Sequence, residues 1–290
     1  MKKDVKIGFI GQGFIGKSYA DDFENRGFSV VRYALEEPYI NNKDLLKGCD
    51  IVFIAVPTPT TVKGFDISIV EGTLSLLSEG TTVIIKSTII PGTVKKLSEK
   101  FPQLYIMHSP EFLRERTAAY DAANPERNII GIPSDTPEYR ERAQQVMDIL
   151  PKAPYTDICA AEEAELVKYG SNCFLMTKVI FMNIMYDMAQ SHGADFDTIA
   201  KAMKADSRIG DSHMNPVHAS GHVEETAVGR GAGGHCFIKD FAAFANLYEQ
   251  TTNDTDGLHV LRAIEQKNSQ LLRASNKDIP LLEDVYGTES

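Results

Sequence analysis

Short apolar runs alternate with amphipathic segments along the first 150 residues of the chain. The apolar runs are rich in β-branched side chains and predict strands at 5–10, 29–33, 51–56, 81–85, 104–108 and 128–132. Helical spacing of apolar residues lies between most of them, for example at 15–25, 67–77 and 93–100. Apolar strands separated by helices predict a parallel sheet covered on both faces, and right-handed crossovers make it a doubly wound α/β fold.

A helical pattern replaces this alternation after residue 154. Residues 160–191 contain no proline and one glycine, Gly170, and their apolar residues recur every three or four positions. This spacing predicts one long helix. Further helices are expected at 195–203, from Asp240 and from about Leu258. We therefore expect a sheet domain over 1–154 and an all-helical domain over 155–290, built around the long central helix.

Composition excludes several classes of protein. The 290 residues include 40 acidic and 30 basic side chains, a net charge of −10, which argues against a nucleic-acid partner. The four cysteines form no CxxC pair, and the N-terminus lacks the apolar stretch of a signal peptide. The most apolar long stretch, 174–189, contains charged residues and is too polar to span a membrane. We expect a cytoplasmic protein.

Gly11, Gly13 and Gly16 form a GxGxxG motif directly after the first expected strand, where the first expected helix begins. In this context the glycines permit a tight turn, a close approach of the backbone to a pyrophosphate and close packing of helix on strand. Phe14 and Ile15 begin the helix, whose N-terminal N–H groups can bind phosphates. The motif predicts a Rossmann-type domain that binds a nicotinamide dinucleotide.

One element of that site is missing from the sequence. The acidic residue that usually ends the second strand and binds the ribose is replaced by Ala34. Glu36 or Glu37 could substitute through a shifted loop, ribose binding could be weaker, or Arg32 could tolerate a 2′-phosphate. NAD is favoured, and NADP stays open.

A glycine-rich segment leads to Cys236, and Asp240 follows four residues later. Glycines such as Gly233 let backbone groups approach a substrate closely. A cysteine at the start of a helix can be an effective nucleophile, and Asp240, one turn on, could face the same cavity and hold a water molecule. The other three cysteines fall in apolar runs and are expected to be buried.

Lys168 and Asn172 are four residues apart on the long predicted helix, and therefore on one face. Such a pair can donate hydrogen bonds to an oxygen that gains negative charge during hydride transfer, although it can also be a solvated helix face. Two further segments, 86–88 and 110–115, follow predicted strands. The ends of parallel strands are where ligands bind in open α/β sheets.

These motifs together resemble those of the UDP-glucose/GDP-mannose 6-dehydrogenase family of nucleotide-sugar dehydrogenases. The motifs that carry the resemblance, in family order, are 11–16, 56–60, 86–88 with 91–93, 109–113, 165–168 with Asn172, 207–210 and 233–240. In combination they are far more specific than any one of them.

The resemblance implies a role for each site residue. Cys236 would be the covalent nucleophile, Lys168 and Asn172 would stabilise the oxyanion, and Asp240 would orient or activate water. Thr88 and Glu111 would hold a water network. The implied cofactor-binding residues are Gly11, Gly13, Phe14, Ile15, Gly16, Pro57, Thr58, Thr88 and Glu115. The implied substrate-binding residues are Phe112, Leu113, Gly233 and Arg208, which would reach the sugar nucleotide of the neighbouring subunit.

The resemblance also implies a reaction and a partner. The C6 alcohol of a UDP-hexose, UDP-glucose or a UDP-N-acetylhexosamine, would be oxidised in two NAD-dependent steps to a uronic acid for polysaccharide biosynthesis, through a thiohemiacetal and a thioester on Cys236. Members of the family dimerise through the long central helix, here 160–191. They also carry a C-terminal UDP-binding domain, for which this chain is expected to be too short.

Other functions remain open from the residues alone. A β-hydroxyacid-type dehydrogenase would transfer one hydride, using Lys168 and Asn172 and leaving Cys236 as a bystander. A non-catalytic remnant would bind only NAD or a partner chain. The histidines of the glycine-rich segment could build a metal site, although their spacing matches no standard zinc pattern and we expect none: His213, His218, His222 and His235.

Overall fold

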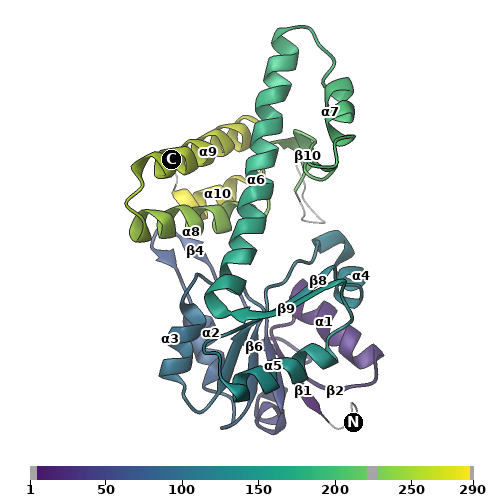
Figure 1. The fold of residues 1–290 in the computed structure, drawn as a ribbon, viewed down its shortest axis with the longest axis vertical. Coiled ribbons are helices and arrows are strands. Elements are labelled where there is room, and N and C mark those ends of the chain that lie inside the picture. The colour runs from purple at the N-terminus through teal and green to yellow at the C-terminus, as the bar shows by residue number, and fades with distance from the viewer. Residues whose placement is uncertain (1–4, 221–227, 288–290) are drawn as a thin grey trace. The chain divides into compact units, whose positions relative to one another are not determined.

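The computed structural model describes residues 5–220 and 228–287 (Figure 1). The chain divides into two compact units. The first comprises Met1–Pro59 and Asp66–Lys168, and the second comprises Thr60–Phe65 and Tyr169–Ser290. The division falls inside the long helix, later than the predicted domain boundary at 154, because the sequence just after that boundary still adds a strand to the sheet of the first unit.

A seven-stranded sheet forms the centre of the first unit. Its strands, in spatial order, are β2 (Ser29–Tyr33), β1 (Lys6–Ile10), β3 (Ile51–Ile54), β6 (Thr82–Ile85), β7 (Tyr105–His108), β8 (Arg127–Ile132) and β9 (Tyr155–Ala160). The chain moves outward from β1 to β2 and then crosses to β3 on the other side of β1. The strand order therefore reverses between β1 and β3, and the carboxyl ends of these strands are where a doubly wound sheet binds its ligand.

The sheet is not wholly parallel. The first five strands in spatial order pair in parallel, but β8 is antiparallel to β7, and β9, which the sequence did not predict, is parallel to β8. The helix between β7 and β8, α4 (Ala118–Ala123), packs against α1 (Phe14–Asn25). The chain can thus begin β8 at the same end of the sheet at which β7 stops, and β8 then runs antiparallel to β7.

Helices cover the sheet, and an aromatic cluster fills its core. The remaining helical elements of the first unit are η1 (Ile40–Gly48), α2 (Ser68–Leu74), α3 (Thr93–Lys100), η2 (Glu115–Thr117) and α5 (Pro137–Ile149). Phe9 of β1 stacks on Phe53 of β3, and Phe23 of α1 packs on both rings. This contact fixes α1, and with it the GxGxxG loop, on the sheet.

The second unit is mainly helical. Its helices are α6 (Ala161–Ser191), which begins in the first unit, α7 (Phe196–Lys204), α8 (His235–Thr251), α9 (Thr255–Ala274) and α10 (Ile279–Tyr286). The prediction of one long helix is confirmed, whereas α10 was not predicted and α8 begins five residues before Asp240. Two strand pairs accompany the helices: β4 (Thr60–Thr61) with β5 (Gly64–Phe65), and β10 (Val217–Ala219) with β11 (Val228–Arg230).

The helices of the second unit share apolar contacts. Side chains of α6, α8 and α9 meet around Met176 and Phe241, and α10 packs its Leu282 against Ile238 of α8 and Leu272 of α9. Figure 1 shows α8, α9 and α10 beside α6. No helix of the described residues is long and apolar enough to cross a membrane.

Candidate active site

The loop between β1 and α1 has the geometry that a dinucleotide pyrophosphate needs. Gly11 has a φ of +90°, and a Cβ there would overlap the carbonyl oxygen of Ala55. A Cβ at Gly16 would overlap the carbonyl oxygen of Gly11, so both positions require glycine. At Gly13, which precedes Phe14 and the helix, no neighbouring atom lies within 4 Å of the place of a Cβ. The open backbone at this helix start fits the phosphates of a nicotinamide cofactor.

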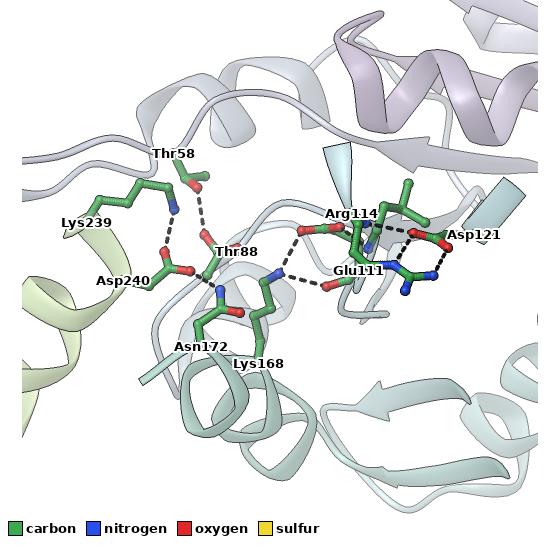
Figure 2. Close-up of polar contacts among 10 residues, drawn as sticks. Thr58, Thr88, Glu111, Arg114, Asp121, Lys168, Asn172, Lys239 and Asp240 are labelled. Atoms are coloured by element: carbon green, nitrogen blue, oxygen red, sulfur yellow. Dashed lines mark hydrogen bonds and ion pairs between the residues drawn. The ribbon is translucent and has the colours of Figure 1, made fainter. Parts of the chain in front are cut away.

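Two loops at the carboxyl ends of β3 and β6 are tied together. The N–H of Val56 donates to Ser87 Oγ at 3.0 Å, and that hydroxyl donates to the Val56 carbonyl at 2.7 Å. Thr58 Oγ1 donates to the carbonyl oxygen of Thr88 at 2.7 Å (Figure 2). Pro57, which lies between Val56 and Thr58 in the chain, is exposed. The structure thus gathers three residues that the sequence assigned to the cofactor, and their binding role stays a prediction.

A buried ion pair joins the loop after β7 to the start of α6. Lys168 Nζ lies 2.7 Å from Glu111 Oε1, and these side chains are 5% and 3% exposed. Lys168 also donates to the Glu111 carbonyl at 2.8 Å, while Glu111 Oε2 accepts from the N–H of Leu113 at 2.9 Å. The ring of Phe112 lies 5.8 Å from Lys168 Nζ. Glu111 therefore fixes an ammonium group in a dry environment, where it can stabilise a developing negative charge strongly.

A second polar cluster lies in the second unit, around Asp240 of α8. This side chain is 1% exposed, and both of its carboxylate oxygens accept hydrogen bonds. Asn172 Nδ2 of α6 donates to Oδ2 at 2.6 Å, and Lys239 Nζ donates to Oδ1 at 2.5 Å (Figure 2). The sequence predicted Asn172 and Asp240 as site residues but not their contact, and it missed Lys239, whose only signal was its place beside Asp240.

Cys236 is the second residue of α8, so its predicted place at a helix start is confirmed. It lies four residues, about one turn, before Asp240 on the same helix. Cys236 is half-buried, and Gly234, the residue directly before the helix, has a φ of +86°. All four cysteines belong to the described residues, and none forms a disulfide. The Cys236 thiol thus lies in the first turn of α8, and the buried Asp240 carboxylate lies about one turn further along the same helix.

Lys86 is a buried cation in the predicted segment 86–88, and the sequence assigned it no role of its own. It directly follows β6, and its Nζ donates to Ser109 Oγ at 2.9 Å and lies 4.5 Å from the centre of the Tyr19 ring. Burial lowers the pKa of Lys86 to about 8, although the charge of Glu111 opposes the shift. A lysine directly after an apolar strand was the available signal.

Three other predicted binding residues lie in different settings. Arg208 follows α7, is 87% exposed and pairs with Asp206 at 2.6 Å. Glu115 begins η2 and is half-buried. A Cβ at Gly233 would overlap the Asp278 carboxylate, so packing within the chain explains the glycine there. Substrate or cofactor binding by these residues stays a prediction.

The structure describes the side chains of two of the four histidines of the glycine-rich segment. His213 and His218 are half-buried, and burial lowers the pKa of His218 to about 4. His222 and the side chain of His235 lie outside what the structure describes. Over the described ranges, no group of three or more His, Cys, Asp or Glu side chains is arranged to hold a metal ion.

Two segments of the chain match one protein family. Residues 39–150 match the NAD binding domain of the UDP-glucose/GDP-mannose dehydrogenase family, and residues 162–270 match its central domain. These segments contain Thr88, Glu111, Lys168, Asn172 and Cys236. The resemblance drawn from the motifs is confirmed.

Individual relatives agree. A UDP-glucose 6-dehydrogenase of Rickettsia bellii is 33% identical over 78% of this chain and 50% of its own length. One of Streptococcus pneumoniae is 30% identical over 81% of this chain and 67% of its own length. The solved structure of a UDP-glucose dehydrogenase from Pyrobaculum islandicum superposes with a TM-score of 0.77 at 25% identity, covering 93% of this chain and 69% of that one. The chain thus spans about half the length of the Rickettsia relative and two thirds of the other two.

Proposed function

Because the chain belongs to the UDP-glucose/GDP-mannose dehydrogenase family, we propose that it is an NAD-dependent dehydrogenase of nucleotide sugars. Its substrate is the C6 alcohol of a UDP-hexose, UDP-glucose or a UDP-N-acetylhexosamine, and its product is the uronic acid. The observation that carries this proposal is the placement of Cys236 at the start of α8, one turn before the buried Asp240. A dehydrogenase that transfers a single hydride needs no such nucleophile.

The cysteine gives the second oxidation a route to the acid. The alcohol first loses a hydride and its hydroxyl proton and becomes an aldehyde. The Cys236 thiol adds to the carbonyl carbon, and its proton passes to the oxygen, which gives a thiohemiacetal. Loss of a second hydride and proton leaves a thioester. Water then attacks, the carbon–sulfur bond breaks, and the acid and the thiol are released.

The polar clusters supply the remaining chemistry. Lys168, held by Glu111, and Asn172 stabilise the oxygen that gains negative charge in each step. Asp240 orients and activates the hydrolytic water, and Thr88 and Glu111 hold the water network. The proposed substrate contacts are Phe112, Leu113, Arg208 and Gly233.

The cofactor belongs in the cradle at the start of α1. Gly11, Gly13, Phe14, Ile15 and Gly16 hold its pyrophosphate, and the proposed further contacts are Pro57, Thr58, Thr88 and Glu115. When bound, NAD supplies the two-electron acceptor, so that each acid formed requires two molecules.

The proposal is tested by the number of NADH molecules formed per molecule of uronic acid. The purified chain is incubated with NAD and a panel of UDP-hexoses, and NADH is measured against uronic acid. Two NADH per acid support the proposal. One NADH per oxidised product would indicate a two-electron dehydrogenase, and no turnover despite NAD binding would leave only a cofactor-binding role.

Arg32 favours NAD over NADP. This buried guanidinium near the end of β2 contacts both carboxylate oxygens of Glu24, at 3.0 and 2.7 Å, and Asp21 Oδ1 at 2.6 Å. A 2′-phosphate would have to compete with two carboxylates for this cation, whereas a free ribose hydroxyl makes no such demand. Arg32 is therefore already neutralised by its own neighbours.

We expect calorimetric titration to give at least about tenfold weaker binding of NADP than of NAD. The Asp21→Asn/Glu24→Gln double variant frees Arg32 and is expected to strengthen NADP binding several-fold. Glu36→Gln and Glu37→Gln are run in parallel, since a loss of NAD affinity in either would assign the ribose to that residue. Equal affinities of the wild type for both cofactors would contradict the role given to Arg32.

The partner we propose is a second copy of the chain, bound through α6. Phe174, Phe181, Ile184 and Met188 are exposed and recur at spacings of seven, three and four residues, which places them on one stripe of the helix. Sedimentation is expected to show a dimer, and Phe181→Glu a monomer. Val260→Glu, the same kind of change at an exposed site on α9, is the control. A dimer that survives Phe181→Glu would place the interface elsewhere.

A further inference from the structure

The glycine loop, residues 229–234, leads directly into α8 and Cys236. Its backbone is bound by side chains from one part of the chain, α9 and the turn that joins α9 to α10. These side chains are Asn268, Ser275, Lys277 and Asp278.

Lys277 is the central contact of this turn. It is fully buried, and its Nζ donates to the carbonyl oxygens of Gly231 at 2.9 Å, His218 at 3.0 Å and Gly229 at 3.3 Å. Burial lowers the pKa of Lys277 to about 8, and the charge of Asp278 opposes that shift. A buried carbonyl without a donor is costly, so this ammonium group fixes the loop at two points, Gly229 and Gly231, and joins it to His218 of β10.

Two neutral side chains hold the loop residues that follow each of these points. Ser275 Oγ accepts from the N–H of Arg230 at 2.9 Å. Asn268 binds both backbone groups of Ala232: its side-chain oxygen accepts from the N–H at 2.7 Å, and its side-chain nitrogen donates to the carbonyl at 2.9 Å. Carbonyl and N–H groups of the loop backbone thus find their hydrogen-bond partners in side chains of one segment of the chain.

Asp278 holds the end of the loop. Its Oδ2 accepts from the N–H of Gly234 at 2.9 Å and from the hydroxyl of Ser220. Gly234 is the residue directly before α8, two residues before Cys236. A side chain at Gly233 would overlap this carboxylate.

The same loop is anchored on its other side to α6. Arg230 donates to Asn183 Oδ1 at 2.8 Å and pairs with Asp187 Oδ1 at 2.7 Å. The loop is thus held between α6 and the α9–α10 turn. Directly after the loop begins α8, the helix that carries Cys236.

We infer that Lys277 and Asp278 are positioning residues that hold Cys236 at the first turn of α8, in place for attack on the aldehyde. The inference rests on the proposed function of Cys236. The two residues act through the loop backbone and not on the substrate. Loss of either contact releases the loop end and lets Cys236 leave its position while the rest of the second unit stays folded.

The first experiment uses alkylation by iodoacetamide, which requires no substrate. Asp278 has a φ of +53°, so Asp278→Gly removes the carboxylate without straining the turn. Peptide mass mapping is expected to show Cys236 alkylated about tenfold faster, because the released loop exposes the thiol. Cys159 in the same samples serves as the internal control.

The matched control variant is Asn276→Gly. Asn276 lies in the same turn, is exposed, has a φ of +48° and takes part in none of the contacts described above. It is expected to leave the Cys236 rate within about twofold of wild type. A Cys236 rate in Asp278→Gly that equals or falls below that of Asn276→Gly would overturn the inference.

The second experiment follows product partition in Lys277→Met, which keeps an unbranched side chain of nearly the same length and removes its ammonium group. Aldehyde, trapped with hydroxylamine, is expected to rise at the expense of acid about tenfold, with NAD affinity unchanged. A purely structural loss would lower the active fraction and leave the aldehyde-to-acid ratio as in wild type, which would overturn the inference. If Lys277→Met does not fold, Asp278→Gly is used in the same assay.

The two proposals fail separately. A wild-type chain that oxidises no UDP-hexose refutes the proposed function, and the alkylation rates still decide whether the turn controls Cys236. Normal turnover with unchanged alkylation and partition refutes the positioning role alone.

Discussion

Replacing Cys236 with serine is expected to lower uronic acid formation by on the order of 10³-fold while NAD still binds. A serine hydroxyl is far less acidic than a thiol and adds to the aldehyde weakly, so the second oxidation loses its covalent intermediate. The change is nearly isosteric at a half-buried position, and the thermal midpoint is expected to stay close to wild type. NADH and acid are measured after quenching, with the aldehyde trapped by hydroxylamine.

Cys159→Ser is the control for this prediction. Cys159 is half-buried in β9, and burial raises the pKa of its thiol to about 11, which leaves it unreactive at neutral pH. Its replacement is expected to leave the ratio of NADH to acid at two. A Cys236→Ser variant that still yields two NADH per acid would remove the cysteine from the mechanism, and the second oxidation would then need another route to the acid.

The elements that the sequence predicted best are those whose local signals and tertiary roles agree. The run predicted as a helix over 93–100 is α3, Thr93–Lys100, preceded by Gly92 in a left-handed conformation. The first predicted helix is α1, which begins at Phe14 directly after the glycines. Gly92, directly before α3, and Gly11, three residues before α1, both have a positive φ that favours glycine, so that sequence and structure carry the same information there.

The missed elements lack such signals. β9 is an edge strand with mostly exposed or half-buried residues, so it carries no apolar run. The strand pairs β4–β5 and β10–β11 have only two or three residues per strand. The antiparallel β8 depends on where α4 packs, which periodicity does not record.

The site shows the same limit. Spacing correctly placed Lys168 and Asn172 one turn apart on one helix, but it could not supply their partners. Lys168 pairs with a glutamate 57 residues earlier, and Asn172 with an aspartate 68 residues later. Lys277 is harder still, because a lysine in a polar turn is normally solvated, and only the tertiary structure shows it buried among carbonyl groups.

The Glu111–Lys168 pair leads to the second large effect. Lys168→Met is expected to reduce hydride transfer about 10²–10³-fold, because it removes a preorganised donor to the reacting oxygen. It also leaves the Glu111 carboxylate buried without its counter-charge, which is expected to cost about 3–5 kcal/mol in the free energy of unfolding. Thermal unfolding and steady-state rates on the same preparation measure both losses.

The Lys168→Met/Glu111→Gln double variant separates these two losses. Neutral glutamine needs no counter-charge, and its side-chain oxygen can still accept from the N–H of Leu113, so most of the stability is expected to return. The rate is expected to stay at least about 10²-fold below wild type, because no ammonium group is present to stabilise the oxyanion. Recovery of the rate together with stability would mean that Lys168 acts only in folding, and the oxyanion role would then fall to Asn172 or another donor.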